Sequence, residues 1–237
     1  MRLDAPLIEG KFLKRYKRFF VDVELEDGSI VTAHCPNTGS LKGCKVEGAP
    51  VWLRDTQNPK RKLQYSWQAI QIGRTWVNVD TGLPNHTVRD AVERDLVPEL
   101  TGYAEVKPEQ KYGTGSRIDL LLSGNGKPDC YVEIKNTTLT DGKLAQFPDA
   151  VTSRGLKHLG ELEEVVRQGH RAVQFFFVSR SDVNRFAPAD EIDPAYCAGL
   201  RQAASNGVEV LAYSVKVTKR QIQLHERLEV VLERTPN

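Results

Sequence analysis

Residues 116–122 read Ser-Arg-Ile-Asp-Leu-Leu-Leu and residues 130–135 read Cys-Tyr-Val-Glu-Ile-Lys, with a glycine-containing break between them. Both segments have the apolar character and the length of β-strands, yet Asp119, Glu133 and Lys135 place charges inside them. Residues two apart on a strand point to the same face of a sheet, so Glu133 and Lys135 share a face. If the two strands pair, the three charged side chains converge at one end of a sheet.

Two carboxylates can hold a hard divalent cation, and an ammonium group can orient a water or stabilise negative charge. The cluster of Asp119, Glu133 and Lys135 therefore suits metal-assisted hydrolysis of a phosphodiester. The Glu-x-Lys spacing alone carries no weight, because it recurs at Glu105 and Glu109, where no apolar strand bearing an Asp precedes it. A salt-bridged cluster at the end of a strand stays open as the alternative.

The composition is that of a globular protein. The chain has 237 residues, of which 40% are hydrophobic and 27% charged, which is enough for one large domain or two small ones. No apolar run approaches the roughly 20 residues that span a bilayer, and the first residues form no apolar signal segment, so we expect a cytoplasmic protein that does not enter a membrane. The four cysteines include no Cys-x-x-Cys pair, which argues against a zinc site and fits free thiols.

Basic residues concentrate in the first third of the chain. Residues 1–85 hold 13 Lys and Arg against 9 Asp and Glu, whereas the remainder holds 20 against 22. This uneven distribution favours a polyanion as a partner.

The first 80 residues have the pattern of an all-β domain. Asp27-Gly28 is a hairpin signal, and short strands are expected at residues 7–16, 19–25, 30–35, 49–55, 63–72 and 75–79. Five to six short strands with frequent turns predict a small barrel.

Beyond residue 83 the pattern changes to alternating helices and strands. Val88, Val92, Leu96 and Leu100 recur every four residues and predict a helix over residues 86–100. A longer helix is expected at residues 148–168, with Val151 on its apolar stripe. The other expected elements are strands at residues 104–112, 118–122, 131–134, 172–178 and 208–217, a helix at 194–204, and a final strand or helix at 222–232. This order predicts a mixed α/β sheet with helices on both faces.

The order of these elements, with Asp119 in one strand and Glu133 and Lys135 in the next, resembles the core of the restriction-endonuclease-type PD-(D/E)xK nucleases. In that fold the first helix often supplies a further acid, and Glu93 is the candidate because it borders the apolar stripe. The whole chain resembles the sugar fermentation stimulation protein (SfsA) family. Four blocks carry this resemblance: 34–40 (His-Cys-Pro-Asn-Thr-Gly-Ser), 116–119 (Ser-Arg-Ile-Asp), 132–136 (Val-Glu-Ile-Lys-Asn) and 147–159 (Phe-Pro-Asp-Ala-Val-Thr-Ser-Arg-Gly-Leu-Lys-His-Leu).

The resemblance implies an α+β protein of two domains. An N-terminal OB-like β-barrel that binds nucleic acid is expected over residues 1–83, and a mixed α/β restriction-endonuclease-like (PD-(D/E)xK) domain over residues 84–237. The resemblance also implies DNA binding of low sequence specificity and a regulatory link to sugar utilisation, particularly maltose utilisation. The chain departs from the nuclease pattern where Ile118 replaces the proline before Asp119.

The expected catalytic residues are Asp119, Glu133 and Lys135. Mg²⁺, or Mn²⁺ in its place, is expected on Asp119 and Glu133, with Glu93 joining them. Lys135 would orient the attacking water or stabilise charge on the phosphorane, because such catalysis gains mainly from positioning and charge stabilisation.

Residues 11–20 interleave cations with aromatic rings; cations neutralise phosphates, and rings stack on bases. Phe19 and Phe20 are expected in the barrel core. His34 and Asn37 stand at a strand-to-loop junction, where their side chains either meet phosphate or turn inward to the backbone. The longer helix presents its cations either to a scissile phosphate or simply to solvent. The expected nucleic-acid-binding residues are Arg15, Tyr16, Lys17, Arg18, His34, Asn37, Arg154, Lys157 and His158.

These observations lead to a DNA-binding protein with a nuclease-like metal site. One alternative is an active Mg²⁺-dependent DNA endonuclease, and another is a small-ligand or protein-interaction module without a DNA role. Whether the site is active stays open at this stage, as does the oligomeric state.

Overall fold

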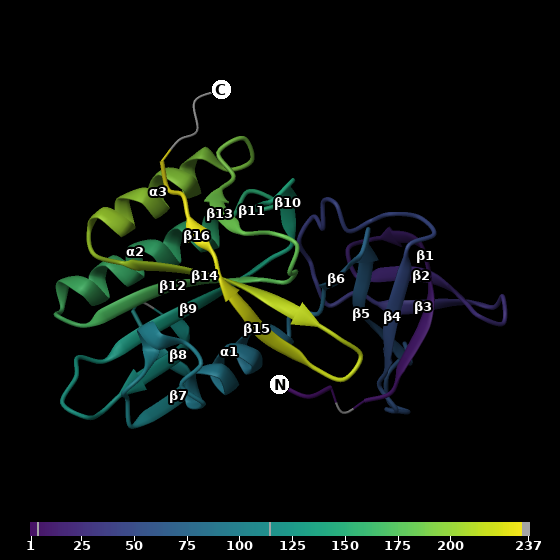
Figure 1. The fold of residues 1–237 in the computed structure, drawn as a ribbon, viewed down its shortest axis with the longest axis horizontal. Coiled ribbons are helices and arrows are strands. Elements are labelled where there is room, and N and C mark those ends of the chain that lie inside the picture. Colours follow the sequence, from purple (N-terminus) through teal and green to yellow (C-terminus); the bar gives the residue numbers. More distant parts are fainter. Residues whose placement is uncertain (4, 114, 234–237) are drawn as a thin grey trace.

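The computed structural model describes residues 1–3, 5–113 and 115–233, which form two domains lying side by side (Figure 1). The strands of the first domain are β1 (Leu7–Tyr16), β2 (Phe20–Leu25), β3 (Ile30–His34), β4 (Pro50–Asp55), β5 (Tyr65–Ile72) and β6 (Thr75–Asn78). They follow the order β3-β2-β1-β4-β5-β6, and β3 also pairs with β5, so five strands close a barrel to which β6 adds an edge. The predicted OB-like barrel is confirmed.

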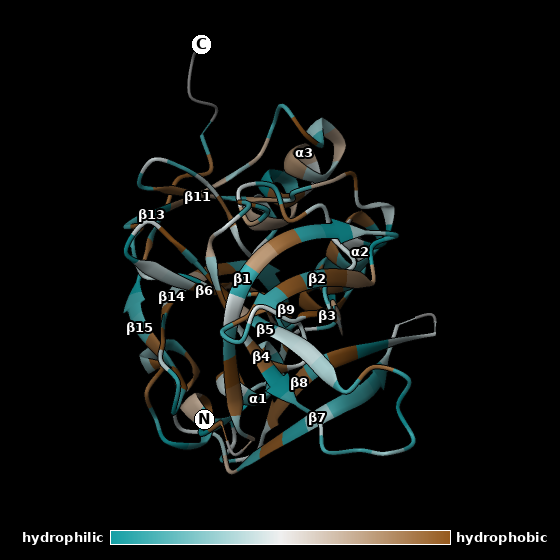
Figure 2. Cartoon of the chain, turned by 90° about the vertical axis from the view of Figure 1, so that its right-hand side faces the viewer, coloured by the Kyte–Doolittle hydropathy of each residue, from teal (hydrophilic) through white to brown (hydrophobic). Residues whose placement is uncertain are grey.

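Alternate side chains of these strands fill the barrel, and Figure 2 shows apolar and polar bands along β1 and β2. Phe12 and Trp67 pack with their ring centroids 5.3 Å apart in this core. Gly10 is required where β1 pairs with the end of β2, because a Cβ at that position would lie 2.5 Å from Val23 Cγ1.

The second domain is built on a six-stranded sheet in the order β15-β14-β12-β9-β8-β7, with a smaller sheet in the order β10-β11-β13-β16 beside it. Its helices are α1 (Leu83–Glu93), η1 (Pro98–Leu100), α2 (Ser153–Arg167) and α3 (Pro194–Ser205). Its strands are β7 (Glu105–Tyr112), β8 (Ser116–Ser123), β9 (Cys130–Thr137), β10 (Leu139–Asp141), β11 (Leu144–Phe147), β12 (Arg171–Val178), β13 (Arg185–Pro188), β14 (Glu209–Val217), β15 (Ile222–Arg227) and β16 (Glu229–Val230).

Helices cover both faces of the larger sheet, as predicted. Apolar residues of α1 pack in one core cluster with Val132 and Phe175, whereas those of α2 and α3 pack in another with Phe176 and Val178. β12 lies between these clusters, which explains why its sequence is almost continuously apolar. Among the described residues, no helix is both long and apolar enough to span a bilayer.

The helix predicted over residues 86–100 is wrong at both ends. α1 begins at Leu83, because Pro84 fits the first helical turn, where its missing N–H is not needed. It ends at Glu93, and Asp95 then adopts a φ of +53°, which interrupts the helical path. Leu96 is consequently 52% exposed instead of lying on an apolar stripe, while Leu100 is buried from the separate helix η1.

Other predicted boundaries also need correction. α2 starts at Ser153 and not at residue 148, since the Thr152 hydroxyl caps it by accepting a hydrogen bond from Gly155 N. Val151 therefore precedes the helix and is 77% exposed. Phe19 is 46% exposed at the β1–β2 turn and does not join the barrel core. The small sheet was not predicted, because its strands are only two to four residues long.

Contacts in several places tie the barrel side of the chain to the second domain. The N-terminal amine of Met1 lies 3.2 Å from Asp90 Oδ2 on α1 and donates a hydrogen bond to the carbonyl oxygen of Ile222 on β15. On the other side, the Ser40 hydroxyl donates to the carbonyl oxygen of Asp149 at 2.7 Å. Leu41 N donates to Asp149 Oδ2 at 2.9 Å. The loop after β3 is thereby fixed to the loop before α2.

Candidate functional site

One pocket in the second domain gathers carboxylates and cations. It has a volume of about 460 Å³ and opens between β7, β8, β9 and the first turns of α2. Its lining residues are Glu109, Gly115, Ser116, Arg117, Asp119, Glu133, Arg154, Lys157 and His158. The acids come from strands and most of the cations from the helix, so the pocket has the chemistry to face a metal ion and an anion together.

Strand pairing places Asp119 opposite Glu133. β8 and β9 are antiparallel, with Leu120 opposite Val132. One residue further along, Asp119 therefore lies opposite Glu133, and both side chains point to the same face of the sheet. Asp119 Oδ2 also accepts a hydrogen bond of 2.6 Å from Ile134 N. The hydrogen bond and the pairing hold the first carboxylate firmly against β9.

Glu133 is only 3% exposed, and its two oxygens differ in their surroundings. Lys135 Nζ donates to Oε1 at 2.6 Å, and His158 Nδ1 donates to the same oxygen at 2.5 Å. Arg154 Nε donates to His158 Nε2 at 3.3 Å, which assigns the hydrogen of the ring to Nδ1. Oε2 is buried and has no hydrogen-bond partner among the described residues. A buried oxygen in this state is costly unless a ligand satisfies it.

The two carboxyl groups differ in acidity. Burial and the negative charge of Glu133 raise the pKa of Asp119 to about 6. Burial also acts to raise the pKa of Glu133, but the hydrogen bond from His158 and the charge of Lys135 outweigh it and hold that pKa below its ordinary value. Near neutral pH Asp119 and Glu133 are therefore both negatively charged and repel each other.

The lysines near the pocket are engaged with the protein. Lys135 is bound to Glu133 and is absent from the pocket lining. Lys157 Nζ donates to Ser116 Oγ at 3.2 Å and lies 3.2 Å from Glu161 Oε1. Arg117 is exposed and makes no ion pair with a described residue, so it is the cation most available to an incoming anion.

Helix α1 does not bring Glu93 to the pocket. The Glu93 side chain is 41% exposed and pairs with Arg89 Nε at 2.7 Å on the outer side of the helix. The residue that α1 turns toward the site is Asn85, whose Nδ2 donates to Asp119 Oδ1 at 2.7 Å. Among the described residues, no three His, Cys, Asp or Glu side chains stand close enough together to surround a metal ion.

The expected nucleic-acid-binding residues of the barrel fall into two groups. Arg15 donates to the carbonyl oxygens of Arg18 at 3.1 Å and Asn37 at 2.7 Å, so its guanidinium organises the loop after β3. Asn37 is 7% exposed, and its Oδ1 accepts from the backbone of that loop. In contrast, Tyr16, Lys17 and Arg18 are exposed at the β1–β2 turn.

His34 occupies an intermediate position at the end of β3. It is partly buried, and its Nδ1 is buried without a hydrogen-bond partner among the described residues. Burial and the charge of Arg61 lower the pKa of His34. The ring is therefore partly enclosed by the protein, but its buried Nδ1 makes no hydrogen bond to the backbone of the described residues.

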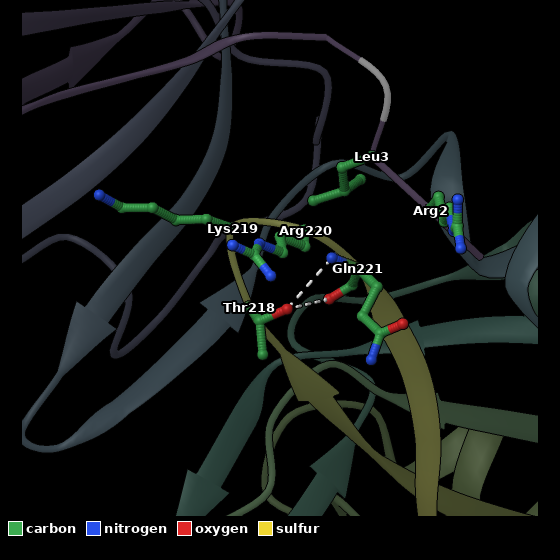
Figure 3. A pocket seen from close by; sticks show the side chains of 6 residues that line it. All are labelled: Arg2, Leu3, Thr218, Lys219, Arg220 and Gln221. Carbon is green, nitrogen blue, oxygen red and sulfur yellow. Dashed lines mark hydrogen bonds between the residues drawn. The ribbon is translucent and has the colours of Figure 1, made fainter.

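A second hollow, of about 860 Å³, lies at the β14–β15 turn beside the N-terminal segment (Figure 3). Its lining includes Arg2 and Arg220, and Thr218 Oγ1 closes the turn by accepting from Gln221 N. β15 is the edge of the sheet opposite β7, so this hollow is separate from the pocket over β8 and β9.

Residues 82–221 match the family described as "Sugar fermentation stimulation protein RE domain", and residues 13–79 match "SfsA N-terminal OB domain". The chain belongs to the sugar fermentation stimulation protein family. A sugar fermentation stimulation protein homolog of Geobacter sulfurreducens is 54% identical over 231 residues, which cover 98% of this chain and 99% of that protein. A homolog of Maricaulis maris is 50% identical over 233 residues, covering 98% and 99% of the two chains.

A solved structure of the same family has the same fold. It is described as the structure of Pyrococcus furiosus SfsA in complex with Ca²⁺. It is 29% identical in sequence, covers 98% of each chain and has a TM-score of 0.86. The two-domain α+β architecture is therefore shared along the whole length of this family member.

Sequence reasoning missed three residues around the site. Asn85 gave no signal, since a single Asn in the first turn of a helix is common. Gln174 did give a sequence signal, because it is the only polar residue within the apolar run of β12. Its Nε2 donates a hydrogen bond to the carbonyl oxygen of Glu133 at 3.0 Å. Glu109 was set aside with its Glu-x-Lys spacing, yet it lines the pocket.

Proposed function

We propose that this protein binds DNA with little sequence preference across both domains and holds a divalent cation at Asp119 and Glu133, beside the bound phosphodiester backbone. The observation that carries this proposal is Glu133 Oε2. It is a buried carboxylate oxygen without a partner, in a pocket that also contains Asp119 and Arg117. A cation would satisfy that oxygen and relieve the repulsion between the two acids.

The residues fit a cation that keeps part of its water shell. Mg²⁺ is usually held by one or two carboxylates together with waters and substrate phosphates. Asp119 and Glu133 supply two carboxylates on one sheet face, with Oδ2 and Oε1 already fixed by hydrogen bonds. When bound, the cation would neutralise phosphate charge and polarise a phosphate oxygen. The Ca²⁺ in the structure of the Pyrococcus furiosus relative supports a divalent-cation site in the family.

The β1–β2 turn supplies the DNA-binding surface of the barrel in this proposal. Lys17 and Arg18 have left-handed backbones, with φ of 48° and 64°, and their side chains are exposed. Tyr16 and Phe19, at 36% and 46% exposure, place aromatic rings beside these cations. Exposed cations and rings together suit sequence-independent binding by phosphate neutralisation and base stacking.

In this proposal the contact between the domains links the turn to the pocket. Arg15 reaches Ser40, Ser40 donates to Asp149, and Asp149 precedes Arg154 of the pocket by five residues. A DNA backbone lying over the loop after β3 would therefore reach both the exposed turn and the acids.

A purified-protein assay tests the proposal. Binding to a labelled duplex, measured by fluorescence anisotropy over a salt series, should weaken with salt, and the slope of log Kd against log salt should fall by about one for each of Lys17→Ala and Arg18→Ala. Unchanged binding in both variants would remove the barrel from the interface. No binding at low salt would favour a module without a DNA role.

Two chemical outcomes remain within this proposal. Cleavage of plasmid DNA with Mg²⁺ or Mn²⁺, lost in Asp119→Asn and Lys135→Ala, would identify an endonuclease. Intact plasmid with binding retained would identify a binding protein that keeps the nuclease fold without hydrolysis. One observation favours the second outcome: Lys135 is bound to Glu133 and does not line the pocket, so it does not face a phosphate in this state.

A further inference from the structure

We infer that a cavity between the two domains binds a small organic carboxylate that carries a hydroxyl group and an apolar body. The cavity has a volume of about 240 Å³ and lies beside the N-terminus, between α1 and the barrel (Figure 1). Arg54 of β4 and Gln68 of β5 line it from the barrel, and Leu83, the first residue of α1, lines it from the second domain. None of its lining residues lines the pocket over β8 and β9, so the inference does not depend on the proposed cation or on DNA binding.

The N-terminal segment forms a further wall of the cavity. Leu3 N donates to the carbonyl oxygen of Arg220 at 2.9 Å, and Ile222 N donates to that of Met1 at 3.1 Å, so this wall is held by the β14–β15 turn. The apolar part of the lining consists of Met1, Leu3, Leu7 and Leu83. An apolar wall with a few polar groups is the usual composition of a small-molecule site.

Gln68 supplies the cavity with an acceptor that has no donor. The side chain is 1% exposed, and its Nε2 donates to Asn78 Oδ1 at 3.0 Å. Asn78 Nδ2 in turn donates to the carbonyl oxygen of Asp80 at 3.0 Å, which fixes the orientation of both amides. Gln68 Oε1 is then buried without a hydrogen-bond partner among the described residues. Leaving such an atom unpaired is costly, so it calls for a ligand that donates a hydrogen bond.

Arg54 supplies a donor to the same cavity. Its Nε is buried and has no hydrogen-bond partner in the part of the chain that the structure describes. Another nitrogen of the guanidinium, Nη2, lies 3.4 Å from Asp80 Oδ2, which is long for a charge-assisted hydrogen bond. Arg2 adds a second cation to the lining, and none of the described lining residues is acidic. The charge around the cavity therefore favours an anion.

These atoms define the chemical class of the ligand. Gln68 Oε1 requires a donor such as a hydroxyl group, and a carboxylate is the strongest acceptor for Arg54 Nε. The volume is below the roughly 300–1,000 Å³ of sites for drug-sized ligands, so the occupant is a small molecule. Ordered water is the competing occupant, because each water takes only about 30 Å³ and can satisfy either atom.

Titration of the full chain with α-hydroxyisocaproate, followed by NMR, tests the inference. This probe has a carboxylate, a hydroxyl group and a branched apolar end. Isocaproate lacks the hydroxyl group and should bind about fivefold more weakly, the loss expected for one neutral hydrogen bond. The uncharged α-hydroxyisocaproamide should bind about tenfold more weakly, because a hydrogen bond to a charged group is the stronger kind.

Two substitutions assign these preferences to the cavity. Gln68→Met removes the acceptor, so α-hydroxyisocaproate and isocaproate should bind this variant equally. Arg54→Met should weaken the binding of both carboxylates about tenfold or more. Because the first test compares two probes on one variant, a change in the stability of that variant does not imitate the expected result.

Two further variants are controls. Gln71→Met makes the same replacement on β5 outside the cavity lining and should keep the fivefold preference for the hydroxylated probe. Asp4 lies outside the described residues but falls between two lining residues in the sequence, so Asp4→Asn should leave the affinities unchanged. Much tighter binding of α-hydroxyisocaproate to Asp4→Asn would show that an acid of the chain occupies the anion position, and would overturn the inference.

The remaining outcomes are equally decisive. No binding of α-hydroxyisocaproate by the wild type would leave water as the occupant and would overturn the inference. Equal affinity in the wild type, Gln68→Met and Arg54→Met would mean that the probe binds elsewhere, with the same consequence. Neither result bears on the proposed function, because these titrations contain no divalent cation and no DNA.

Discussion

Replacing Asp119 by Asn should stabilise the metal-free protein at neutral pH. Asp119 has a pKa of about 6 in the folded protein against an ordinary value of 3.8, chiefly because it is buried and lies beside Glu133. A difference of about two pKa units corresponds to roughly 3 kcal/mol, and this is the upper limit of the stability lost when the buried carboxyl ionises. Asn mimics the protonated acid and removes that cost.

The substitution keeps the local hydrogen bonds. The side-chain oxygen of Asn can still accept from Ile134 N, and its amide can donate to Asn85 after the Asn85 amide turns over. We therefore expect a gain of about 1–3 kcal/mol in the free energy of unfolding at pH 7.5. For a chain of this size that corresponds to roughly 2–4 °C in Tm per kcal/mol.

The sign of the pH dependence follows from the raised pKa. The folded state prefers the protonated acid, so the wild type loses stability as the pH rises from about 4 to about 6 and loses no more from this group above that range. Denaturant unfolding in EDTA at pH 4.5, 5.5 and 7.5 should show the gap between variant and wild type opening with pH. Asp95→Asn, at an exposed position, should stay within about 0.5 kcal/mol throughout. An Asp119→Asn protein no more stable than the wild type at pH 7.5 would refute the reasoning.

Three other substitutions test the supports of the site. His158→Ala leaves Glu133 with one hydrogen-bond donor fewer, so the free energy of unfolding, measured by denaturant, should fall by about 1–3 kcal/mol. His158→Gln keeps a donor and should recover part of that lost stability in the same assay. Asp149→Ala removes the carboxylate that accepts from Leu41 N and leaves the backbone acceptor of Ser40, so hydrogen exchange measured by mass spectrometry should accelerate in residues 36–41 and stay unchanged in β12. Gly39→Ala should destabilise the same loop, because its Cβ would lie 3.1 Å from both Asp149 carboxylate oxygens.

The part of the fold that could be predicted from sequence is the part dominated by side-chain periodicity. The alternation in β1 and the apolar run of β12 follow from burial on one face and on both faces, and each predicts its strand directly. Helix ends depend instead on caps and backbone conformation. The left-handed φ of Asp95 ends α1, and the cap at Thr152 sets the start of α2. Each is the effect of a single residue, whereas the apolar pattern extends over a longer stretch, so both helices were predicted to be too long.

The candidate site was predictable to the extent that it lies on paired strands. The register of β8 and β9 brings Asp119 and Glu133 together. Two apolar strands joined by a short connection are expected to pair, so this proximity could be predicted. Glu93 was a poor choice, since a helix rotates by about 100° per residue and the neighbour of a buried Val92 can face solvent. Glu109 could not be found, because its orientation arises from one left-handed residue inside a strand.

Cation binding should become weaker in acid, because a ligand carboxyl must give up its proton first. Glu133 keeps a lowered pKa and stays ionised, whereas Asp119, with a pKa of about 6, is protonated below that pH. The Ca²⁺ affinity should therefore fall by up to tenfold per pH unit below about 6 and be nearly constant above 7. Titration at pH 5, 6 and 7.5 in two buffers of different ionisation enthalpy measures the affinity and the proton released together. Affinity that is independent of pH, with no proton released at pH 5, would mean that the cation is not held by Asp119.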